Sequence, residues 1–320
     1  MTRVFAPELL LERCAEHVAR SPHVALDEAA LAAVVARVDP ADLRLPDWSG
    51  PAMLEGEPEE VTAWLLAYNA INYSYFPEPG QPRWWTVVAG APAGVDDEAL
   101  GIMAAFAQAL RGGVPLGDGS FLAGLSAASL EALLPPAPGA GPLPLLSERL
   151  AGLHELGGAL QRMGGPAGFL QRADGSAVAF VQALAEACPT WDDAREGAGG
   201  RLHFLKRAQL CAAMLHGRLG LFSDAERLTA FADYRLPQIL RFLGVLRLAP
   251  ALVARIDAGG PIPVGSPEEV ALRAGTVHAA DRLCAAWETD ALRVDYWLWR
   301  AAVDHDAEIP PFHRTRTTDY

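Results

Sequence analysis

Apolar residues recur along most of the chain at the three- and four-residue spacing of an α-helix. This spacing gathers apolar side chains on one face of a helix, which then packs against a protein core. It predicts helices over residues 8–20, 26–38, 61–71, 100–110, 145–163, 176–188, 202–219, 237–248, 267–287 and 289–303. The expected fold is therefore mainly α-helical.

One stretch has the composition of a strand instead. Residues 83–89 (RWWTVVA) are β-branched and aromatic and end at Gly90, which predicts a small β element in the N-terminal third. Residues 115–121 are expected to form a loop, and 134–144 (LPPAPGAGPLP) has the composition of a linker. We expect a single domain over 1–320, with an N-terminal subdomain (1–140) and a helical subdomain (141–320).

Composition limits the classes of function. The chain has 320 residues, of which 51% are hydrophobic and 20% charged, as in a soluble globular protein. Its net charge of -13 argues against duplex nucleic acid as a partner. The sequence has no signal-peptide core and no apolar run that could span a membrane. Its four scattered cysteines are typical of reduced thiols in a cytoplasmic protein: Cys14, Cys188, Cys211 and Cys284.

Several familiar catalytic motifs are absent from the sequence. It contains no Walker motif, no GxSxG and no HExxH. Residues 304–306 (DHD) could bind a metal, but a short acidic triplet is more typical of a solvated turn. We therefore expect neither a metal nor a cofactor.

The segment 201–248 has an unusual charge. It carries eight Lys and Arg residues against three acidic residues, and it contains Lys206, the only lysine in the chain. Lysine supplies a compact charge whose pKa burial can lower, and arginine does not. A basic segment in an acidic protein indicates a site for a small anion such as phosphate.

An acidic residue precedes a predicted helix in the same segment. Proline favours the first turn of a helix, so Pro237 predicts a helix start, with Asp233 and Tyr234 in the turn before it. The positive end of the helix dipole keeps a carboxylate there ionised. Position alone favours the simpler reading that Asp233 is only a helix cap.

Two further segments combine polar and aromatic residues. Asn72 lies among Tyr68, Tyr73, Tyr75 and Phe76, whose rings could stack on a heterocycle. Asp295 lies in the apolar stretch 294–299 (VDYWLW), either as an ordinary helix-face residue or as the counter-ion of a cationic ligand group. The basic tail 311–316 (PFHRTR) is either disordered or docked on the body of the protein.

These segments resemble those of a known family. Residues 231–238 (FADYRLPQ) and 203–209 (HFLKRAQ) are similar to signature segments of the queuosine salvage family, the queuosine 5′-phosphate N-glycosylase/hydrolases. Further similar segments follow in the expected order over almost the whole chain: 69–76 (NAINYSYF), 268–273, 294–299 (VDYWLW) and 311–316 (PFHRTR). The chain departs from the family where Pro77 follows Phe76, and it lacks a tryptophan near residues 101–102.

The resemblance implies an activity and a fold. The family hydrolyses the N-glycosidic bond of queuosine 5′-monophosphate and releases queuine, a 7-deazaguanine with a cyclopentenediol side arm, for salvage into tRNA modification. Its fold resembles helix-hairpin-helix DNA glycosylases, which also place an aspartate at a helix start. For this chain we expect a cytoplasmic monomer that acts on the free nucleotide.

The resemblance also implies residue roles. Asp233 is expected to be the catalytic carboxylate, which stabilises an oxocarbenium-like sugar, activates water or attacks the anomeric carbon. Lys206 would hold the 5′-phosphate or polarise a ribose hydroxyl, with Arg207 and Arg235 as weaker phosphate ligands. Asp295 would pair with the ammonium group of the side arm. The remaining expected substrate contacts are Asn72, which reads the edge of the base, and Tyr73, Phe76, His203, Phe204, Tyr234 and Trp299.

Two alternatives stay open at the level of sequence. The chain could be a non-catalytic protein that binds queuine or its nucleotide. It could also be a glycosylase of another modified nucleotide.

Overall fold

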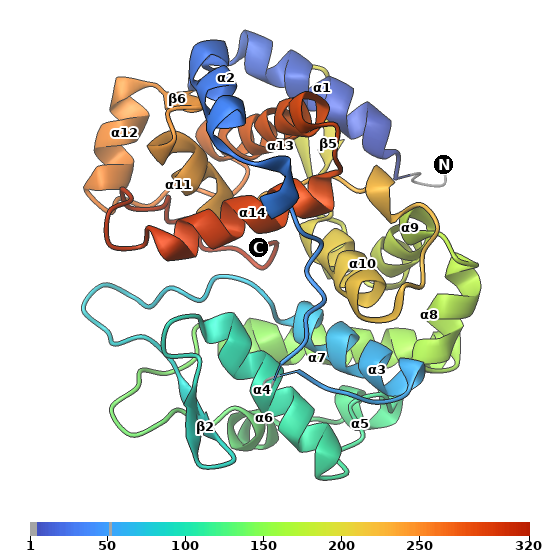
Figure 1. Ribbon diagram of the computed structural model, residues 1–320. Coiled ribbons are helices and arrows are strands. Elements are labelled where there is room, and N and C mark those ends of the chain that lie inside the picture. The colour runs from blue at the N-terminus through green and yellow to red at the C-terminus, as the bar shows by residue number, and fades with distance from the viewer. Residues whose placement is uncertain (1–4, 51–52) are drawn as a thin grey trace.

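The computed structural model describes residues 5–50 and 53–320. Within these ranges the chain forms fourteen α-helices, three short 3-10 helices and six short strands. The prediction of a mainly helical fold is confirmed. Figure 1 shows α3 to α7 in the lower part of the molecule, and α1, α2 and α11 to α14 in the upper part.

The α-helices are α1 (Pro7–Arg20), α2 (Glu28–Arg37), α3 (Pro58–Ala70), α4 (Glu98–Arg111), α5 (Gly119–Ala123), α6 (Ala127–Leu133), α7 (Leu146–Met163), α8 (Pro166–Ala173), α9 (Ala177–Ala187), α10 (Lys206–Leu219), α11 (Arg235–Phe242), α12 (Pro250–Asp257), α13 (Pro267–Trp287) and α14 (Ala291–Asp304). The 3-10 helices are η1 (Pro40–Asp42), η2 (Pro189–Trp191) and η3 (Ala225–Arg227).

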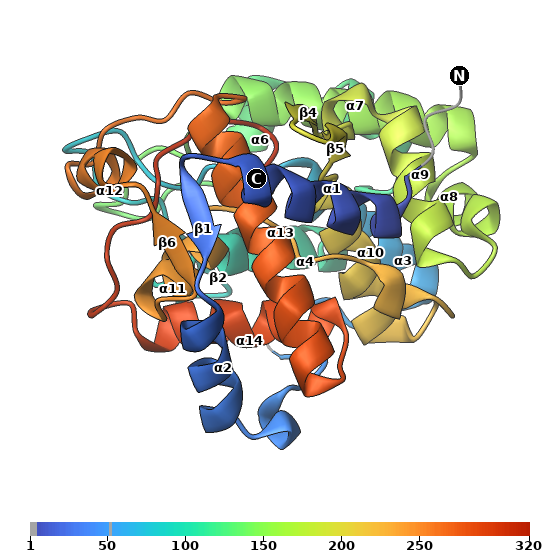
Figure 2. The same cartoon turned by 90° about the horizontal axis from the view of Figure 1, so that it is seen from above.

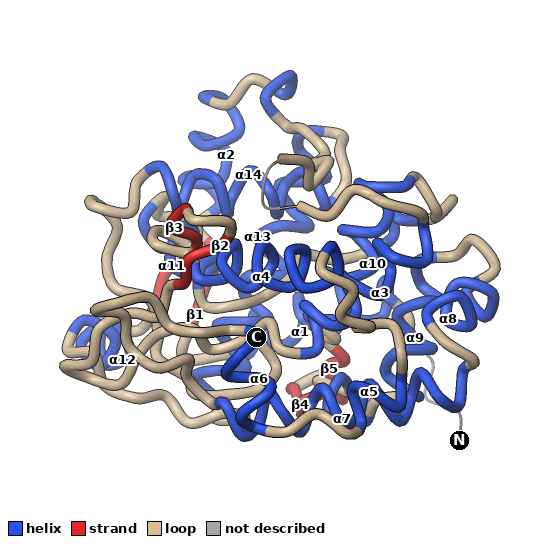
Figure 3. The backbone as a smooth tube through the Cα atoms, turned by 90° about the horizontal axis from the view of Figure 1, so that it is seen from below, coloured by secondary structure: helices blue, strands red, loops and turns tan. Residues whose placement is uncertain are grey.

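The strands form three separate two-stranded antiparallel sheets. They are β1 (Val24–Leu26) with β6 (Leu246–Leu248), β2 (Thr86–Val88) with β3 (Ala91–Ala93), and β4 (Ala194–Gly197) with β5 (Gly200–His203). The strand expected at 83–89 is therefore confirmed in part. Figure 3 shows how little of the molecule the strands occupy beside the helices.

The first elements of the chain pack with the last ones. α1 packs across α13, and β1 pairs with β6, with Val24 opposite Leu248; both neighbours are visible in Figure 2. No helix of the described residues is long and apolar enough to span a membrane.

Helix α3 is the central helix of the lower part. Every residue from Val61 to Ala70 is buried, because α3 is surrounded by α4, α7, α8 and α10. A helix that is apolar all round has no solvent-facing side. Its start is fixed by a capping box between Glu57 and Glu60. Its buried C-terminal end leads into the loop that carries Asn72.

Some predicted boundaries were wrong. Residues 202–203 belong to β5, so α10 begins at Lys206. Helix α11 ends at Phe242, and residues 246–248 form β6 instead of continuing the helix. The loop expected at 115–121 contains the first turn of α5, capped by the Asp118 carboxylate. In each case a short element is stabilised by a partner or a cap that the helical pattern does not reveal.

The linker-like segment 134–144 is packed against the body of the protein. The Ala137 amide donates to the Trp85 carbonyl at 2.8 Å, and the Gly141 amide donates to the Arg83 carbonyl at 3.0 Å. The proline-rich composition therefore produces an ordered coil beside the β2–β3 hairpin.

Candidate active site

A cavity of about 720 Å³ lies between the upper and lower parts of the molecule. Its walls come from the loop after η1, the end of α3, the starts of α4, α10 and α11, one face of α14, and the C-terminal segment 311–320. The volume is within the range of small-molecule sites. Segments that lie far apart in sequence thus meet at one cavity.

Lys206 is the first residue of α10 and lines this cavity. The residue before it, Leu205, has a left-handed backbone (φ 45°), which turns the chain sharply from β5 into the helix. The Lys206 side chain is only 6% exposed. Burial lowers the pKa of Lys206, while the negative charges of Asp233 and Asp295 oppose that shift. Among the described residues its ammonium group forms no ion pair, so its three donors remain available to a ligand.

Asp233 lies two residues before the start of α11. Its Oδ1 atom accepts hydrogen bonds from the backbone amides of Arg235 at 2.8 Å and Leu236 at 3.0 Å. These bonds satisfy free amides of the first helical turn and fix the carboxylate. Asp233 also lines the cavity, and its Oδ2 has no hydrogen-bond donor among the described residues. The residue is thus a helix cap with one oxygen left to face a ligand.

Asp295 lies in the middle of α14 and is 8% exposed. Its Oδ1 accepts a hydrogen bond from the Phe231 amide at 2.7 Å, which ties α14 to the segment that carries Asp233. The pKa of Asp295 is raised to about 7: burial is the largest cause and the charge of Asp233 also raises it, while the Phe231 bond and Lys206 lower it. Lys206, Asp233 and Asp295 therefore form one electrostatic group at this end of the cavity.

A buried arginine holds the backbone around this group. Arg273 of α13 is fully buried, and its Nη1 and Nη2 donate to the two carboxylate oxygens of Asp193 at 2.7 and 2.5 Å. Asp193 also accepts from the Lys206 amide at 3.4 Å. The Nε of Arg273 donates to the carbonyl of Ala232 at 3.0 Å. The Arg273 guanidinium thereby connects the start of α10, where Lys206 lies, to the backbone just before Asp233.

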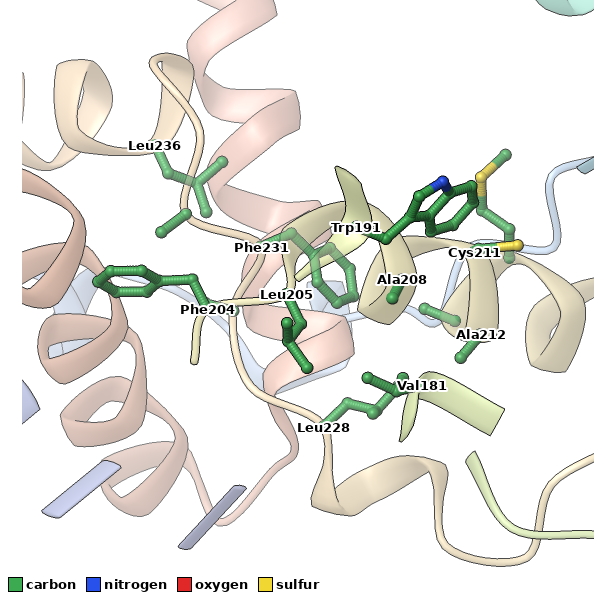
Figure 4. Packing of buried hydrophobic residues seen from close by; sticks show 14 of the residues in the cluster. Val181, Trp191, Phe204, Leu205, Ala208, Cys211, Ala212, Leu228, Phe231 and Leu236 are labelled. Carbon is green, nitrogen blue, oxygen red and sulfur yellow. The ribbon is translucent and has the colours of Figure 1, made fainter. Parts of the chain in front are cut away.

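Hydrophobic packing supports the same two segments. Figure 4 shows Phe204 and Leu205, which precede Lys206, and Phe231 and Leu236, which flank Asp233, within the buried cluster. The guanidinium carbon of Arg273 lies 4.2 Å from the centre of the Phe204 ring. Such packing keeps side chains in single positions, as a catalytic group requires.

Aromatic rings form another part of the cavity wall. Tyr234 and Phe312 have ring centres 4.7 Å apart, and each lies 5.6 Å from the ring of Phe76. On α14, Tyr296 and Trp299 are stacked with an interplanar angle of 18°. Flat apolar surfaces of this kind suit a planar heterocycle.

The loop after α3 is held by arginines that donate to its carbonyls. Arg149 donates to the carbonyls of Ile71 and Tyr73, and Arg316 donates to that of Phe76. Within the loop, Asn72 Oδ1 accepts a hydrogen bond from the Tyr75 hydroxyl at 2.9 Å. The side-chain carbonyl of Asn72 therefore already has a hydrogen-bond donor in this structure.

Nine of the twelve predicted site residues line the cavity. They are Asn72, Tyr73, Phe76, Lys206, Asp233, Tyr234, Arg235, Asp295 and Trp299.

The other three predicted residues, His203, Phe204 and Arg207, are not among the described residues that line the cavity. Arg207 donates to the carbonyls of Ala70 and Thr190, and Phe204 packs on Arg273. His203 lies in β5, and its Nδ1 is 3.6 Å from a carboxylate oxygen of Asp192. These three residues therefore have protein partners outside the cavity wall, and their contact with the substrate stays a prediction.

Several lining residues were missed by the sequence analysis, among them Trp48, Asp97, Phe312 and Tyr320. Trp48 lies in a loop with no periodic pattern, and Asp97 has the sequence signature of an ordinary helix cap. For Phe312 a signal existed in the aromatic and basic tail 311–316. Among the described residues no group of three His, Cys, Asp or Glu side chains is arranged to hold a metal ion.

Comparison with known proteins gives matches over most of the chain. A family model described as "Queuosine salvage protein" matches residues 53–320. A protein of Sphaerobacter thermophilus named queuosine 5′-phosphate N-glycosylase/hydrolase is 35% identical over 315 residues, which cover 95% of each chain. Proteins with the same name from Mus musculus (31% identical, 83% of each chain) and Bos taurus (28% identical, 90% of each chain) are also similar.

Proposed function

Because the chain belongs to the queuosine salvage protein family, we propose that it hydrolyses the N-glycosidic bond of queuosine 5′-monophosphate and releases queuine. The observation that carries this proposal is the position of Asp233. One of its oxygens is fixed by two amides of α11, and the other is free beside Lys206 in an enclosed aromatic cavity.

Asp233 is the proposed catalytic residue. As the bond between the ribose C1′ and the base breaks, its electron pair leaves with the base and the sugar becomes oxocarbenium-like. A carboxylate fixed in position stabilises that positive charge. Water then adds hydroxide to C1′, and its proton replaces the sugar on the base, so the products are queuine and ribose 5-phosphate.

Lys206 is the proposed ligand of the 5′-phosphate or of a ribose hydroxyl. It is a buried cation without an ion pair among the described residues, and it lies at the same end of the cavity as Asp233. Arg235 is a weaker phosphate ligand, because its Nη2 is 2.7 Å from the Asp306 carboxylate. A partner already in place reduces the gain from a second anion.

The rings of Phe76, Tyr234, Phe312 and Trp299 are proposed to contact the planar base. Asp295 is proposed to accept from the N–H groups on the edge of the guanine-like ring, since it lines the cavity and its Oδ2 has no donor among the described residues. A carboxylate accepts two such hydrogen bonds.

We further propose that the protein acts as a cytoplasmic monomer on a free nucleotide. The net charge of -13 disfavours duplex nucleic acid, and all four cysteines are free thiols. A relationship of the fold to helix-hairpin-helix DNA glycosylases is part of the same proposal. It is supported by the aspartate at the start of α11.

The test is incubation of the purified protein with queuosine 5′-monophosphate, with queuosine, and with guanosine monophosphate. Products are separated by chromatography and identified by mass. We expect queuine only from the queuosine nucleotide. Asp233→Asn should lower kcat by about 10²–10⁴, and it should stay folded because the amide oxygen of Asn still accepts from the α11 backbone.

Two other results would point elsewhere. Binding of the nucleotide without turnover, with equal affinity in Asp233→Asn, would support a non-catalytic binding protein. Release of guanine from guanosine monophosphate at the same rate would support a glycosylase of broader substrate range.

A further inference from the structure

The cavity contains a further carboxylate without an ion pair among the described residues, at the start of α4. Asp97 caps this helix, and its Oδ1 accepts a hydrogen bond from the Ala99 amide at 3.0 Å. Asp97 lines the cavity, and over residues 5–50 and 53–320 it forms no ion pair. A carboxylate that faces an enclosed space without a cation favours a positively charged ligand group.

The arginines nearest to Asp97 are committed to other acids. Arg83 donates to both oxygens of Glu98 at 2.6 Å each, although Asp97 is the preceding residue. Arg235 pairs with Asp306 at 2.7 Å. Burial therefore dominates and raises the pKa of Asp97 to about 6, with the charge of Glu98 adding to the effect and the Ala99 bond and the two arginines opposing it.

Three tyrosines that line the same cavity lie within electrostatic range of Asp97. Burial raises the pKa values of Tyr68, Tyr75 and Tyr234, and in each case the negative charge of Asp97 raises them further. All three rings line the cavity. Aromatic rings beside a carboxylate are the usual surroundings of a bound ammonium group, because ring faces and the anion both attract a cation.

Asp295 is a poorer partner for an ammonium group. The positive charge of Lys206 lies close enough to Asp295 to lower its pKa. A second cation placed there would be repelled by Lys206. At Asp97 burial has the largest effect on the pKa, and the two cations that lower it, Arg235 and Arg83, already have acidic partners in Asp306 and Glu98.

We propose that Asp97, together with the rings of Tyr68, Tyr75 and Tyr234, binds the protonated amine of the queuosine side arm. This inference rests on the proposed function and assigns a specificity-determining subsite within the same cavity. It moves the partner of the ammonium group from Asp295, where the sequence placed it, to the start of α4. The reactive end with Lys206 and Asp233 then contacts the sugar and phosphate.

The test compares two nucleotides that differ in the side arm. Queuosine 5′-monophosphate carries the amine, and 7-deazaguanosine 5′-monophosphate does not. In Asp97→Asn we expect kcat/KM for the first to fall by about 30-fold or more, as for loss of one partner of a buried charge pair. For the second, kcat/KM should change by less than about threefold, since no cation is involved.

The matched control is Asp27→Asn, which makes the same change at the cap of α2. Asp27 accepts from the Ala30 amide at 2.9 Å, as Asp97 does from Ala99, but it does not line the cavity. Asparagine caps a helix as well as aspartate, so both variants should fold. Equal losses for both nucleotides in Asp97→Asn, or no loss for either, would overturn the proposal.

A binding measurement separates this inference from the proposed reaction. Calorimetric titration with 7-aminomethyl-7-deazaguanine and 7-cyano-7-deazaguanine compares a charged and a neutral arm and needs no turnover. The wild type should prefer the charged base, and Asp97→Asn should lose that preference. Lack of hydrolysis with this preference intact would refute the reaction alone, and a preference unchanged in Asp97→Asn would refute the subsite alone.

Discussion

The only lysine of the chain differs from the buried arginines in its hydrogen-bond partners. Arg149, Arg207 and Arg273 are buried, and each donates to carbonyl or carboxylate oxygens of the protein. Lys206 is buried as well, yet its ammonium group has no such partner among the described residues. An arginine there would bring five donors that need acceptors and a charge that cannot be lost. A lysine brings only three donors, so its charge remains available to a ligand.

Asp295 should make stability depend on pH. Its pKa is raised to about 7 in the folded protein, whereas an unfolded aspartate has a pKa of about 4. The folded state holds this proton between those values, so the stabilisation is present at low pH and is lost as the pH rises through about 7. We expect Asp295→Asn to gain roughly 2 kcal/mol relative to wild type between pH 5 and pH 8.

Urea unfolding at pH 5, 6 and 8 measures this difference. Asparagine keeps an acceptor for the Phe231 amide, so the variant removes the titration and keeps the hydrogen bond. Asp118→Asn, at the cap of α5, serves as the control and should follow the wild type. A constant difference between Asp295→Asn and wild type at all three pH values would contradict the raised pKa.

At the scale of elements, α13 positions two segments that carry the proposed catalytic groups. Arg273 joins α13 to Asp193 and to the carbonyl of Ala232, so it fixes both the start of α10 and the approach to α11. Removing one partner of a buried pair leaves the other charge exposed to an apolar interior. Arg273→Met should therefore lower the free energy of unfolding by about 3–5 kcal/mol.

The double variant Arg273→Met/Asp193→Leu separates stability from positioning. Replacing a buried pair by apolar residues often restores stability, so its urea midpoint should rise above that of Arg273→Met. The recovery should be partial, because Glu269, 3.7 Å from Arg273, loses its cation and keeps only the Gly265 amide and the Tyr320 hydroxyl as donors. Its kcat should remain low, because the Ala232 carbonyl and the Lys206 amide have lost their partners. Recovery of kcat together with stability would show that Arg273 does not position the site.

The elements that could be read from the sequence are those whose stability is local. Helices α1, α3, α13 and α14 were predicted within about three residues of their observed ends, because their apolar spacing and capping residues are contiguous. β1 and β6 are three residues each and exist because they pair across more than 200 residues of chain. No local pattern specifies such a pairing. Because of it, residues 246–248, which were expected to lie in a helix, form β6 instead.

The same distinction holds for the candidate site. Lys206, Asp233 and Asp295 could be chosen because their residue types are unusual in their settings. Asp97 could not, since its sequence context is that of a helix cap and only the folded chain reveals that the nearby Arg83 and Arg235 pair with other acids. His203, Phe204 and Arg207 were selected from the segment 203–209 that resembles the family. They neighbour Lys206 in sequence but do not line the cavity.

At the scale of the whole molecule, the C-terminal segment connects the two parts that enclose the cavity. Its residue Arg314 forms a parallel bridge with Pro261, and its carbonyl accepts from the Ile262 amide at 3.0 Å. At the other side, the Ser74 hydroxyl donates to the Thr317 carbonyl at 2.7 Å. The segment also contributes Phe312 and Tyr320 to the cavity wall. The tail that the sequence left as either disordered or docked is docked.

Ser74 should therefore affect both stability and substrate binding. Its Oγ also accepts from the Thr317 amide at 3.0 Å, and Ser74 is fully buried. Ser74→Ala leaves two buried backbone groups without partners and should lower the free energy of unfolding by about 2–4 kcal/mol. We expect KM for queuosine 5′-monophosphate to rise more than kcat falls, because the wall moves while Asp233 and Lys206 stay in place.

The control for Ser74→Ala is Ser126→Ala, which removes the exposed cap of α6 and should cost only about 1 kcal/mol. Urea unfolding gives the stability of both variants, and limited proteolysis followed by mass analysis detects cleavage within 311–320. Faster cleavage there in Ser74→Ala alone, together with a higher KM, would mean that the segment holds the cavity closed. An unchanged KM despite faster cleavage would mean that the cavity wall does not depend on this connection, and that substrate binding is set by α4, α11 and α14.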